Sequence, residues 1–551
     1  MQSKSIFLRG RDRAGSIREK SSWIVSAPSL LQAVAIMIAL LLLLPSVYLV
    51  IRALGIGAEA FEILMQVRTA QILWNTVLLA LIVTLLSLLI SLPLAWLTTQ
   101  TDLPFRRTWS VLSTLPLVFP SFVGSFALIA MMGPRGMLAS WLEPFGVERI
   151  PSIYGLVGAT WALTSFTYPY LLLSIRSGLR NLDPALQDAA RNLGYGPWRT
   201  FFHITLPALR PGIIAGSLLV SLYALSDFGA VSMLHYNTFT RAIYIHSSNF
   251  DRSRASVLAL VLALLALLLL FSAQRMQGRG RYYRSSAGAI RARKTIALQQ
   301  WKWPALLFCA TIVFIAFVLP ASVVVYWLVR GLSIGESFMP VWVATGNSIQ
   351  AAGLAAITCA LLAMPIAYMI VRYPSRQSRF VENATYVGYG LPGIVIALSL
   401  VYFGAKYLGR NSFISLYQTL TMLICAYAVR FLPQAVGAMR TSLEQISPRL
   451  SDAAQSLGHG RFRTFFRVTL PLLRSGIWTG GALVFLTTIK ELPATLILGP
   501  TGFPTLATQI WSATEEAFFA RAAAPALVLL LVSGLSMTIL LRQEEKSESN
   551  R

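Results

Sequence analysis

The chain has 551 residues, of which 56% are hydrophobic and only 12% are charged, and its mean hydropathy is +0.64. This balance excludes an ordinary soluble globular protein and indicates a polytopic membrane protein. The net charge of +25 lies in short segments between apolar runs, where Lys and Arg fix membrane topology. The charge therefore predicts orientation in a lipid bilayer, and not nucleic-acid binding.

Apolar runs of about the 20 residues that a helix needs to cross a bilayer occur along the whole chain. Helices satisfy their own backbone hydrogen bonds, so we predict an all-α fold. The first run follows a basic tail, is longer than the apolar region of a signal peptide and lacks a clear cleavage site, so we interpret it as a retained span. We predict about twelve transmembrane helices, near residues 29–52, 71–98, 109–132, 154–178, 205–232, 254–274, 302–330, 344–372, 381–404, 415–440, 470–497 and 522–542.

A basic segment in the middle of the sequence divides these spans into two sets of six. If the N-terminus is cytoplasmic, nearly every dense basic cluster falls on the cytoplasmic side, as the positive-inside rule requires, and the C-terminus is cytoplasmic too. The predicted organisation is a cytoplasmic tail at 1–28, a first repeat at 29–274, a cytoplasmic linker at 275–301, a second repeat at 302–542 and a tail at 543–551.

One polar stretch occurs twice. "DAARNLGYGPWRTFFHITLP" begins at Asp188 and "DAAQSLGHGRFRTFFRVTLP" begins at Asp452, 264 residues later. An even number of spans per half gives both halves the same orientation, so we predict a parallel repeat of six helices each. Further pairs match at an offset of 272, namely Asn75 and Asn347, Pro93 and Pro365, and Pro120 and Pro392.

Each copy of this stretch predicts a short helix. The pairs Asp183-Pro184 and Ser447-Pro448 are typical helix starts, and Gly194 and Gly458 stand where the helix should end. A helix of about ten residues is marginal alone in water, so it must pack against something. A lipid surface and a groove in a cytoplasmic partner are both possible; the small alanines and the acidic residue favour the protein groove.

The two loops, about 183–207 and 447–471, resemble the EAA loop of permease subunits from ABC importers. In that family the loop docks into ATP-binding subunits. Both copies have Asp where Glu is usual, which keeps the charge. The resemblance implies docking residues at Asp188, Ala189, Ala190, Gly194 and Pro207 in the first half and at Asp452, Ala453, Ala454, Gly458 and Pro471 in the second.

The chain has no G-x-x-x-x-G-K-[ST] phosphate loop and no Gly-Lys dipeptide. It cannot bind ATP by that route. We therefore expect a transport subunit that is not itself an enzyme and carries no cofactor. Two copies of a cytoplasmic ATP-binding subunit, with ATP and Mg, are the expected energy source.

The span after each loop carries a G-x-x-x-G pattern, which allows close helix packing in lipid. The two patterns could form a seam between the halves or pack within each half. The glycines are Gly212 and Gly216 in the first half and Gly476 and Gly480 in the second.

Twenty residues beyond Pro207 lies Asp227, and Glu491 occupies the matched place in the second half. A helical rise of about 1.5 Å per residue puts both near the outer mouth of the protein. Acids beside a span are paired, hydrated or functional. Asp227, Glu491 and Lys490 are thus candidates for the translocation path, while charge compensation of Glu491 by Lys490 is the structural alternative.

The wording around these acids, "SDFGAVSML" and "KELPATLILGPTGFPTLATQIW", resembles the fused two-repeat permeases of bacterial ferric-iron importers, and the resemblance covers most of the chain. It implies a type I ABC importer permease fold in the bacterial inner membrane and a periplasmic or lipid-anchored binding protein that delivers the solute. Fused permeases for thiamine or phosphonate-type solutes share this layout. An ion-gradient-driven secondary transporter and a membrane scaffold are rivals from other classes.

No metal site is predicted. His235 and His246 lie in an outer loop and could be imagined as ligands, but they also fit ordinary loop residues. The three cysteines, Cys309, Cys359 and Cys425, fall in separate apolar runs and are expected to be core residues.

Overall fold

The computed structural model describes residues 28–134, 136–146, 151–182, 189–190, 192–276, 296–337, 339–407 and 418–549. Within these ranges the regular structure is helical, apart from an isolated bridge between Thr101 and Ile296. The predicted all-α fold is confirmed.

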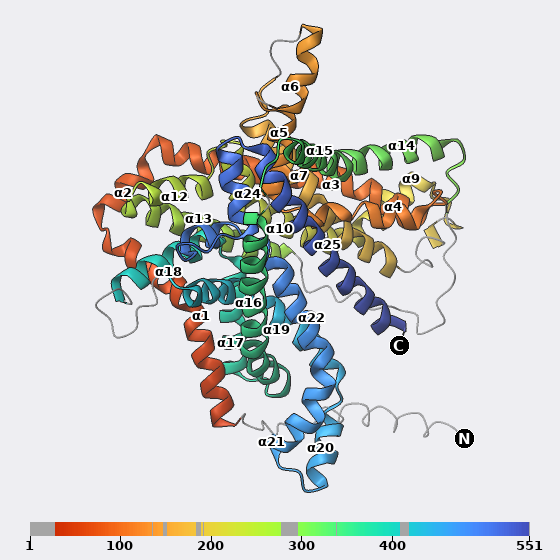
Figure 1. Ribbon diagram of the computed structural model, residues 1–551. Helices are drawn as coiled ribbons and strands as arrows, with labels where there is room; N and C mark the ends of the chain where they lie inside the picture. The colour runs from red at the N-terminus through yellow and green to blue at the C-terminus, as the bar shows by residue number, and fades with distance from the viewer. Residues whose placement is uncertain are drawn as a thin grey trace, which may run out of the picture.

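The helices of the first half are arranged as a series of long spans joined by short helices (Figure 1). They are α1 (Ser29–Gly55), α2 (Ala58–Met65), α3 (Val67–Gln100), α4 (Arg106–Leu112), η1 (Leu115–Val118), α5 (Ser121–Met132), α6 (Met137–Leu142), η2 (Glu143–Phe145), α7 (Leu156–Asn181), α9 (Pro197–Thr200), η3 (Phe201–Thr205), α10 (Leu206–Ser226), α11 (Gly229–Met233), α12 (Phe239–Ser248) and α13 (Arg252–Met276).

The second half follows the same order. Its helices are η4 (Gln299–Trp301), α14 (Lys302–Val313), η5 (Phe314–Val318), α15 (Leu319–Ser333), α16 (Met339–Arg372), α17 (Arg376–Gly390), α18 (Gly393–Tyr407), α19 (Leu420–Gln445), α20 (Pro448–Ser456), α21 (Arg461–Thr464), η6 (Phe465–Thr469), α22 (Leu470–Thr488), α23 (Pro493–Leu498), α24 (Leu506–Glu515) and α25 (Phe519–Ser549).

The internal repeat is visible in the helix lengths. α3 and α16 both have 34 residues, and α7 and α19 both have 26. Even the local irregularities repeat, since η3 and η6 are five-residue π-helical turns at the two "RTFF" segments. The same sequence pattern therefore produces the same backbone in both halves.

Among the residues that the structure describes, ten helices are long and apolar enough to cross a membrane, or eleven if the bent pair α17–α18 counts as one span. About twelve were predicted. The predicted span at 154–178, which is α7, is not among these candidate helices. It is less apolar than the others because it contains several buried polar residues, namely Thr160, Thr164, Ser165 and Thr167. Because α7 packs against α3, α5 and α10, it needs little lipid-facing apolar surface.

Two of the predicted spans are broken at matched prolines. The run at 109–132 divides into α4, η1 and α5, and the run at 381–404 divides into α17 and α18, which meet at a bend of 101°. Phe119 and Leu391, which precede Pro120 and Pro392, have extended backbones with ψ of 120° and 133°. Proline disfavours a helical conformation in the residue before it, and this explains both breaks.

The two halves exchange their first spans. α1 packs against α17 and α18 of the second half, beside which it runs in Figure 1, while α15 packs against α5 of the first half. The exchange ties the repeats together and leaves the helices that follow the loops, α10 and α22, in equivalent surroundings.

The beginning of the second half is fastened to the end of α3. The Asp102 carboxylate accepts hydrogen bonds from the Leu298 amide at 2.8 Å and the Lys302 ammonium at 3.0 Å. The Leu298 amide, with a further contribution from Lys302, holds the pKa of Asp102 below its usual value. The connection between the halves thus ends at a defined point of the first half.

The G-x-x-x-G glycines pack within each half. A Cβ added at Gly216 would lie 3.0 Å from the Leu171 Cα of α7, and one at Gly480 would lie 3.0 Å from the Ala435 Cα of α19. The interpretation of these glycines as a seam between the halves is wrong. They allow α10 to approach α7, and α22 to approach α19, at backbone contact.

This packing predicts different effects for two adjacent glycines. Gly480→Leu should lower the free energy of unfolding by about 1–3 kcal/mol, because the added side chain meets the α19 backbone. Gly481→Leu is the matched control, since a Cβ there meets nothing within 4 Å. Thermal unfolding of the detergent-purified protein measures both. Equal midpoints for the two variants would contradict the close approach.

Candidate functional site

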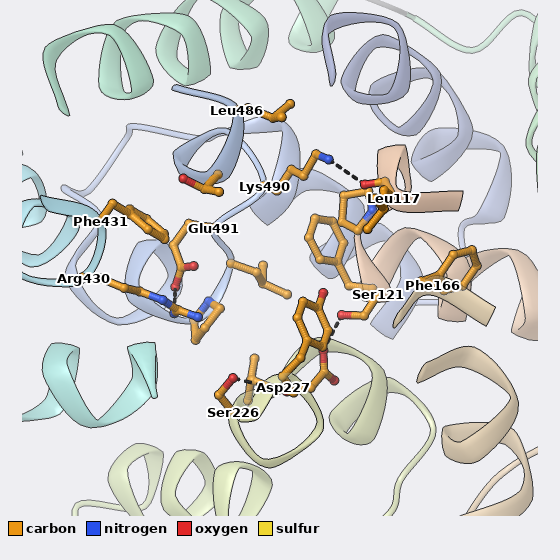
Figure 2. A pocket seen from close by; sticks show the side chains of 18 of the residues that line it. Leu117, Ser121, Phe166, Ser226, Asp227, Arg430, Phe431, Leu486, Lys490 and Glu491 are labelled. Atoms are coloured by element: carbon orange, nitrogen blue, oxygen red, sulfur yellow. Dashed lines mark hydrogen bonds and ion pairs between the residues drawn. The ribbon is translucent and has the colours of Figure 1, made fainter. Parts of the chain in front are cut away.

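A cavity of about 530 Å³ lies between the two halves (Figure 2). Its walls come from the last turns of α10 and α22, from α7 and α19, and from the segments around the broken spans. Both α10 and α22 stop here, and the chain turns into the short helices α11 and α23. The residues at these turns therefore face the interface between the halves.

Asp227 follows the last residue of α10 and is only 7% exposed. Its carboxylate accepts hydrogen bonds from the Ser121 hydroxyl and, at 2.9 Å, from the Ala230 amide. The second bond satisfies an amide at the beginning of α11, which is the usual contribution of an acid three residues earlier. Asp227 thus fastens α11 to the end of α10.

Glu491 repeats this arrangement in the second half and is 6% exposed. Its carboxylate accepts hydrogen bonds from the Ala494 amide, at 3.3 Å, and from the Arg430 guanidinium, at 2.6 Å. Both acids are buried in the lining of the cavity between the halves. Beyond them, the rings of Phe228, Tyr244 and Trp511 pack together across the interface, with centroids 4.9–6.1 Å apart.

The two acids differ in their second partner. The position of Ser121 is taken by Gly393 in the second half, and the position of Arg430 is taken by Phe166 in the first. A Cβ at Gly393 would lie 1.7 Å from Arg430 Nη1, so only glycine leaves room for the guanidinium. Sequence reasoning missed Ser121 and Arg430; the available signal was an arginine in the middle of the apolar run at 415–440.

Lys490 does not neutralise Glu491. Its ammonium donates a hydrogen bond to the Leu117 carbonyl of the first half at 3.0 Å. Figure 2 shows the two neighbouring side chains turned in different directions, Lys490 toward Leu117 and Glu491 toward Arg430. The structural alternative, charge compensation of Glu491 by Lys490, does not hold, because both residues follow the end of α22 and their side chains point to different walls of the cavity. Asp227, Glu491 and Lys490 all line the same cavity.

The two EAA-like loops have the predicted glycine ends. Gly194 and Gly458 have φ of +79° and +85°, in the left-handed region that favours glycine. The amide after each glycine donates to the carbonyl of the buried alanine, Tyr195 to Ala190 at 3.0 Å and His459 to Ala454 at 3.2 Å. Both loops thus close with the same hydrogen bond.

The outer surfaces of these loops carry exposed apolar side chains. Leu193 is 78% exposed and Leu457 is 81% exposed, and Leu450 is exposed as well. In Figure 1, α20 and α21 lie at one end of α22, away from most of the fold. Asp452 and Ala453 are exposed on α20, and Ala189 is exposed in the first loop. Pro207 and Pro471 stand in the first turn of α10 and α22, while Asp183, Pro184 and Asp188 lie outside the described residues.

His235 lies in a turn, whereas His246 lies in α12 and not in a loop as expected. His235 packs against the Tyr154 ring with centroids 5.2 Å apart, and His246 lies 3.3 Å from the Asp251 carboxylate. Burial lowers the pKa of both imidazoles. In the part of the chain that the structure describes, no group of three or more His, Cys, Asp or Glu side chains could hold a metal ion.

The cysteines are free. Cys309 and Cys359 are buried as expected, whereas Cys425 lies on an exposed face of α19 and corrects the prediction for that residue.

The geometry around Asp227 predicts a graded response. Asp227→Leu leaves the Ala230 amide and the Ser121 hydroxyl without their acceptor and should cost about 2 kcal/mol of unfolding free energy. Asp227→Asn keeps an acceptor oxygen and should cost clearly less. Thermal unfolding in detergent measures both, with Ser226→Ala as the control from the same cavity wall. Indistinguishable Leu and Asn variants would contradict the fastening of α11.

Comparison with known proteins identifies the family. The model of the "Binding-protein-dependent transport system inner membrane component" family matches the chain twice, at residues 91–279 and 350–546. The chain is similar to the Fe(3+)-transport system permease protein FbpB 2 of Haemophilus influenzae, with 33% identity over 93% of this chain and 98% of that protein.

More distant similarity reaches two further permeases. The chain is 24% identical to the ferric transport system permease protein FbpB of Actinobacillus pleuropneumoniae over 86% of this chain and 71% of that protein. It is 34% identical to the molybdenum transport system permease protein ModB of Escherichia coli over 36% of this chain and 91% of that protein. The chain therefore belongs to the family of inner membrane components of binding-protein-dependent transport systems, as a permease with two family domains fused in one polypeptide.

Proposed function

We propose that this chain is the permease subunit of an ATP-driven importer that moves ferric iron inward across the bacterial inner membrane. The observation that carries the proposal is the similarity to a Fe(3+) permease over nearly the full length of both chains, including both repeats. A binding-protein-dependent family also disagrees with an ion-gradient-driven transporter and with a scaffold that transports nothing. No observation favours thiamine or a phosphonate-type solute.

The chemistry of the cavity supports this proposal. Ferric iron is a hard cation that prefers oxygen ligands. The cavity offers the carboxylates of Asp227 and Glu491, and the Tyr223 hydroxyl lies beside Ser121. Each carboxylate already has protein partners that compete with a bound ion. This competition suits a transient binding site better than a tight one.

A second candidate substrate is an oxyanion such as molybdate. Arg430 and Lys490 line the cavity and could attract an anion, and each half of the chain has the length of a single-repeat permease. The similarity to the molybdenum permease covers only about a third of this chain, so ferric iron remains the first proposal.

The same proposal assigns the partners. Two copies of one kind of ATP-binding subunit dock on the two loops, because both loops present an equivalent backbone and an exposed leucine. ATP and Mg bind to those subunits, and this chain needs no cofactor of its own. The loops and both termini are then cytoplasmic, and a binding protein delivers the solute at the opposite face.

In this arrangement α10 and α22 connect each loop directly to the cavity. The first loop leads into α10, which ends at Asp227, and the second leads into α22, which ends before Glu491. Movement of the ATP-binding subunits would therefore shift the cavity walls as rigid helices. Alternating access follows from opening and closing the interface between the halves.

Reconstituted transport tests the substrate. Vesicles containing this permease, its ATP-binding subunit and its binding protein should accumulate iron supplied as ferric nitrilotriacetate only when ATP is present on the cytoplasmic side. Molybdate and sulfate should not accumulate. Uptake of an oxyanion in place of iron would support the second candidate, and uptake driven by a proton or sodium gradient without ATP would contradict the importer class.

The loop geometry tests the docking assignment. Gly194→Val with Gly458→Val forces a β-branched residue into a left-handed backbone and should abolish co-purification of the ATP-binding subunit, while the permease still inserts in the membrane. Gly196→Ala with Gly460→Ala is the matched control, because a Cβ at either position meets nothing within 4 Å. Co-purification that survives the valine pair would argue against docking at these loops.

A further inference from the structure

Arg430 is a cation in the lining of a cavity that also contains two buried carboxylates from opposite halves. Its guanidinium lies 2.6 Å from the Glu491 carboxylate, and Asp227 of the other half lines the same cavity. The side chain is 21% exposed, and that exposure is toward the cavity that it lines. Arg430 therefore occupies, beside Glu491, the kind of position that a transported cation would take in this cavity.

The repeat shows that the scaffold does not require this arginine. The first half builds the same turn and fastens the same acid with Ser121, and it has Phe166 where the second half has Arg430. The second half also has Gly393 where the first half has Ser121, and a Cβ at this position would collide with the guanidinium. Two substitutions relative to the first half thus act together to bring one positive charge to Glu491.

A cation that arrives in this cavity must compete with the guanidinium. A carboxylate in a region of low dielectric constant needs partners, and Glu491 has only the Arg430 guanidinium and the Ala494 amide, so the loss of Arg430 favours another cation in its place. A trivalent ion has a higher charge density than a guanidinium and can displace it, whereas monovalent ions cannot. When the ion leaves, the tethered guanidinium returns without having to diffuse.

We propose that Arg430 is a tethered cation that holds the Glu491 carboxylate while the cavity is empty and sets the selectivity and release rate of the cavity for a highly charged cation. The inference rests on the proposed function and deepens it. The incoming ferric ion displaces the Arg430 guanidinium from the Glu491 carboxylate, and the guanidinium then competes with the ion for the same carboxylate. The competition prevents the ion from remaining in the cavity.

Metal retention and transport together test this inference. The full complex with Arg430→Gln, purified in detergent and dialysed against ferric nitrilotriacetate, should retain at least ten times more iron than the wild-type complex. Its ATP-dependent uptake in vesicles should fall at least tenfold. Arg430→Lys keeps the charge and should stay within about threefold of wild type in both measurements.

Two further variants separate this role from a structural one. Gly393→Ala displaces the guanidinium without removing it and should raise iron retention in the same direction, which also answers the question if Arg430→Gln does not fold. Arg440→Gln is the matched control, because Arg440 lies on the same helix and pairs with Glu382 and Glu444 outside the cavity lining. Iron retention in the Arg440 variant should equal that of wild type.

The outcomes are distinguishable. Iron uptake by the wild type, with equal retention in the wild type, Arg430→Gln and Gly393→Ala, would overturn this inference and leave the proposed function standing. Wild-type vesicles that accumulate molybdate in place of iron, and lose that uptake with Arg430→Gln, would overturn both and make Arg430 an anion ligand. A gain of retention in both cavity variants but not in Arg440→Gln supports the tethered cation.

Discussion

The close packing of α10 on α7, and of α22 on α19, is the constraint on which the rest of the structure depends. Glycines remove side chains at the crossings, so that the helix backbones meet. Each pair then behaves as one rigid unit with a loop at its beginning and a buried acid at its end. A looser crossing would let α10 and α22 shift against α7 and α19, so that less of a displacement at the loops would reach the walls of the cavity.

The cavity combines strict repetition with local asymmetry. Backbone breaks at Pro120 and Pro392 and the capping of a short helix by an acid recur in both halves. The second partner of each acid does not recur, since the Ser121 hydroxyl donates to Asp227 and the Arg430 guanidinium donates to Glu491. Fusion of the halves in one chain makes this possible, because each copy can change without changing the other.

The loops and the cavity differ in how their side chains are satisfied: the loops expose apolar side chains, whereas the charged groups of the cavity have partners within the protein. The loops expose leucines beside a fixed backbone, which suits a protein partner that covers them. The cavity keeps its charged groups in contact with protein acceptors and donors, including the bond from Lys490 to the Leu117 carbonyl of the other half.

The sequence by itself determined the membrane class, the all-α fold, the repeat, the glycine ends of both loops and the resemblance to importer permeases. These properties depend on hydropathy, periodicity and residues close together in the chain. The tertiary structure decided which helix the glycines contact, where two spans break, why α7 needs little apolar surface, and which groups meet the acids. Ser121 lies 106 residues from Asp227, Arg430 lies 61 from Glu491 and Leu117 lies 373 from Lys490. Local sequence patterns do not reveal such contacts, because the first two form only when the helices of one half pack together and the third only when the two halves meet.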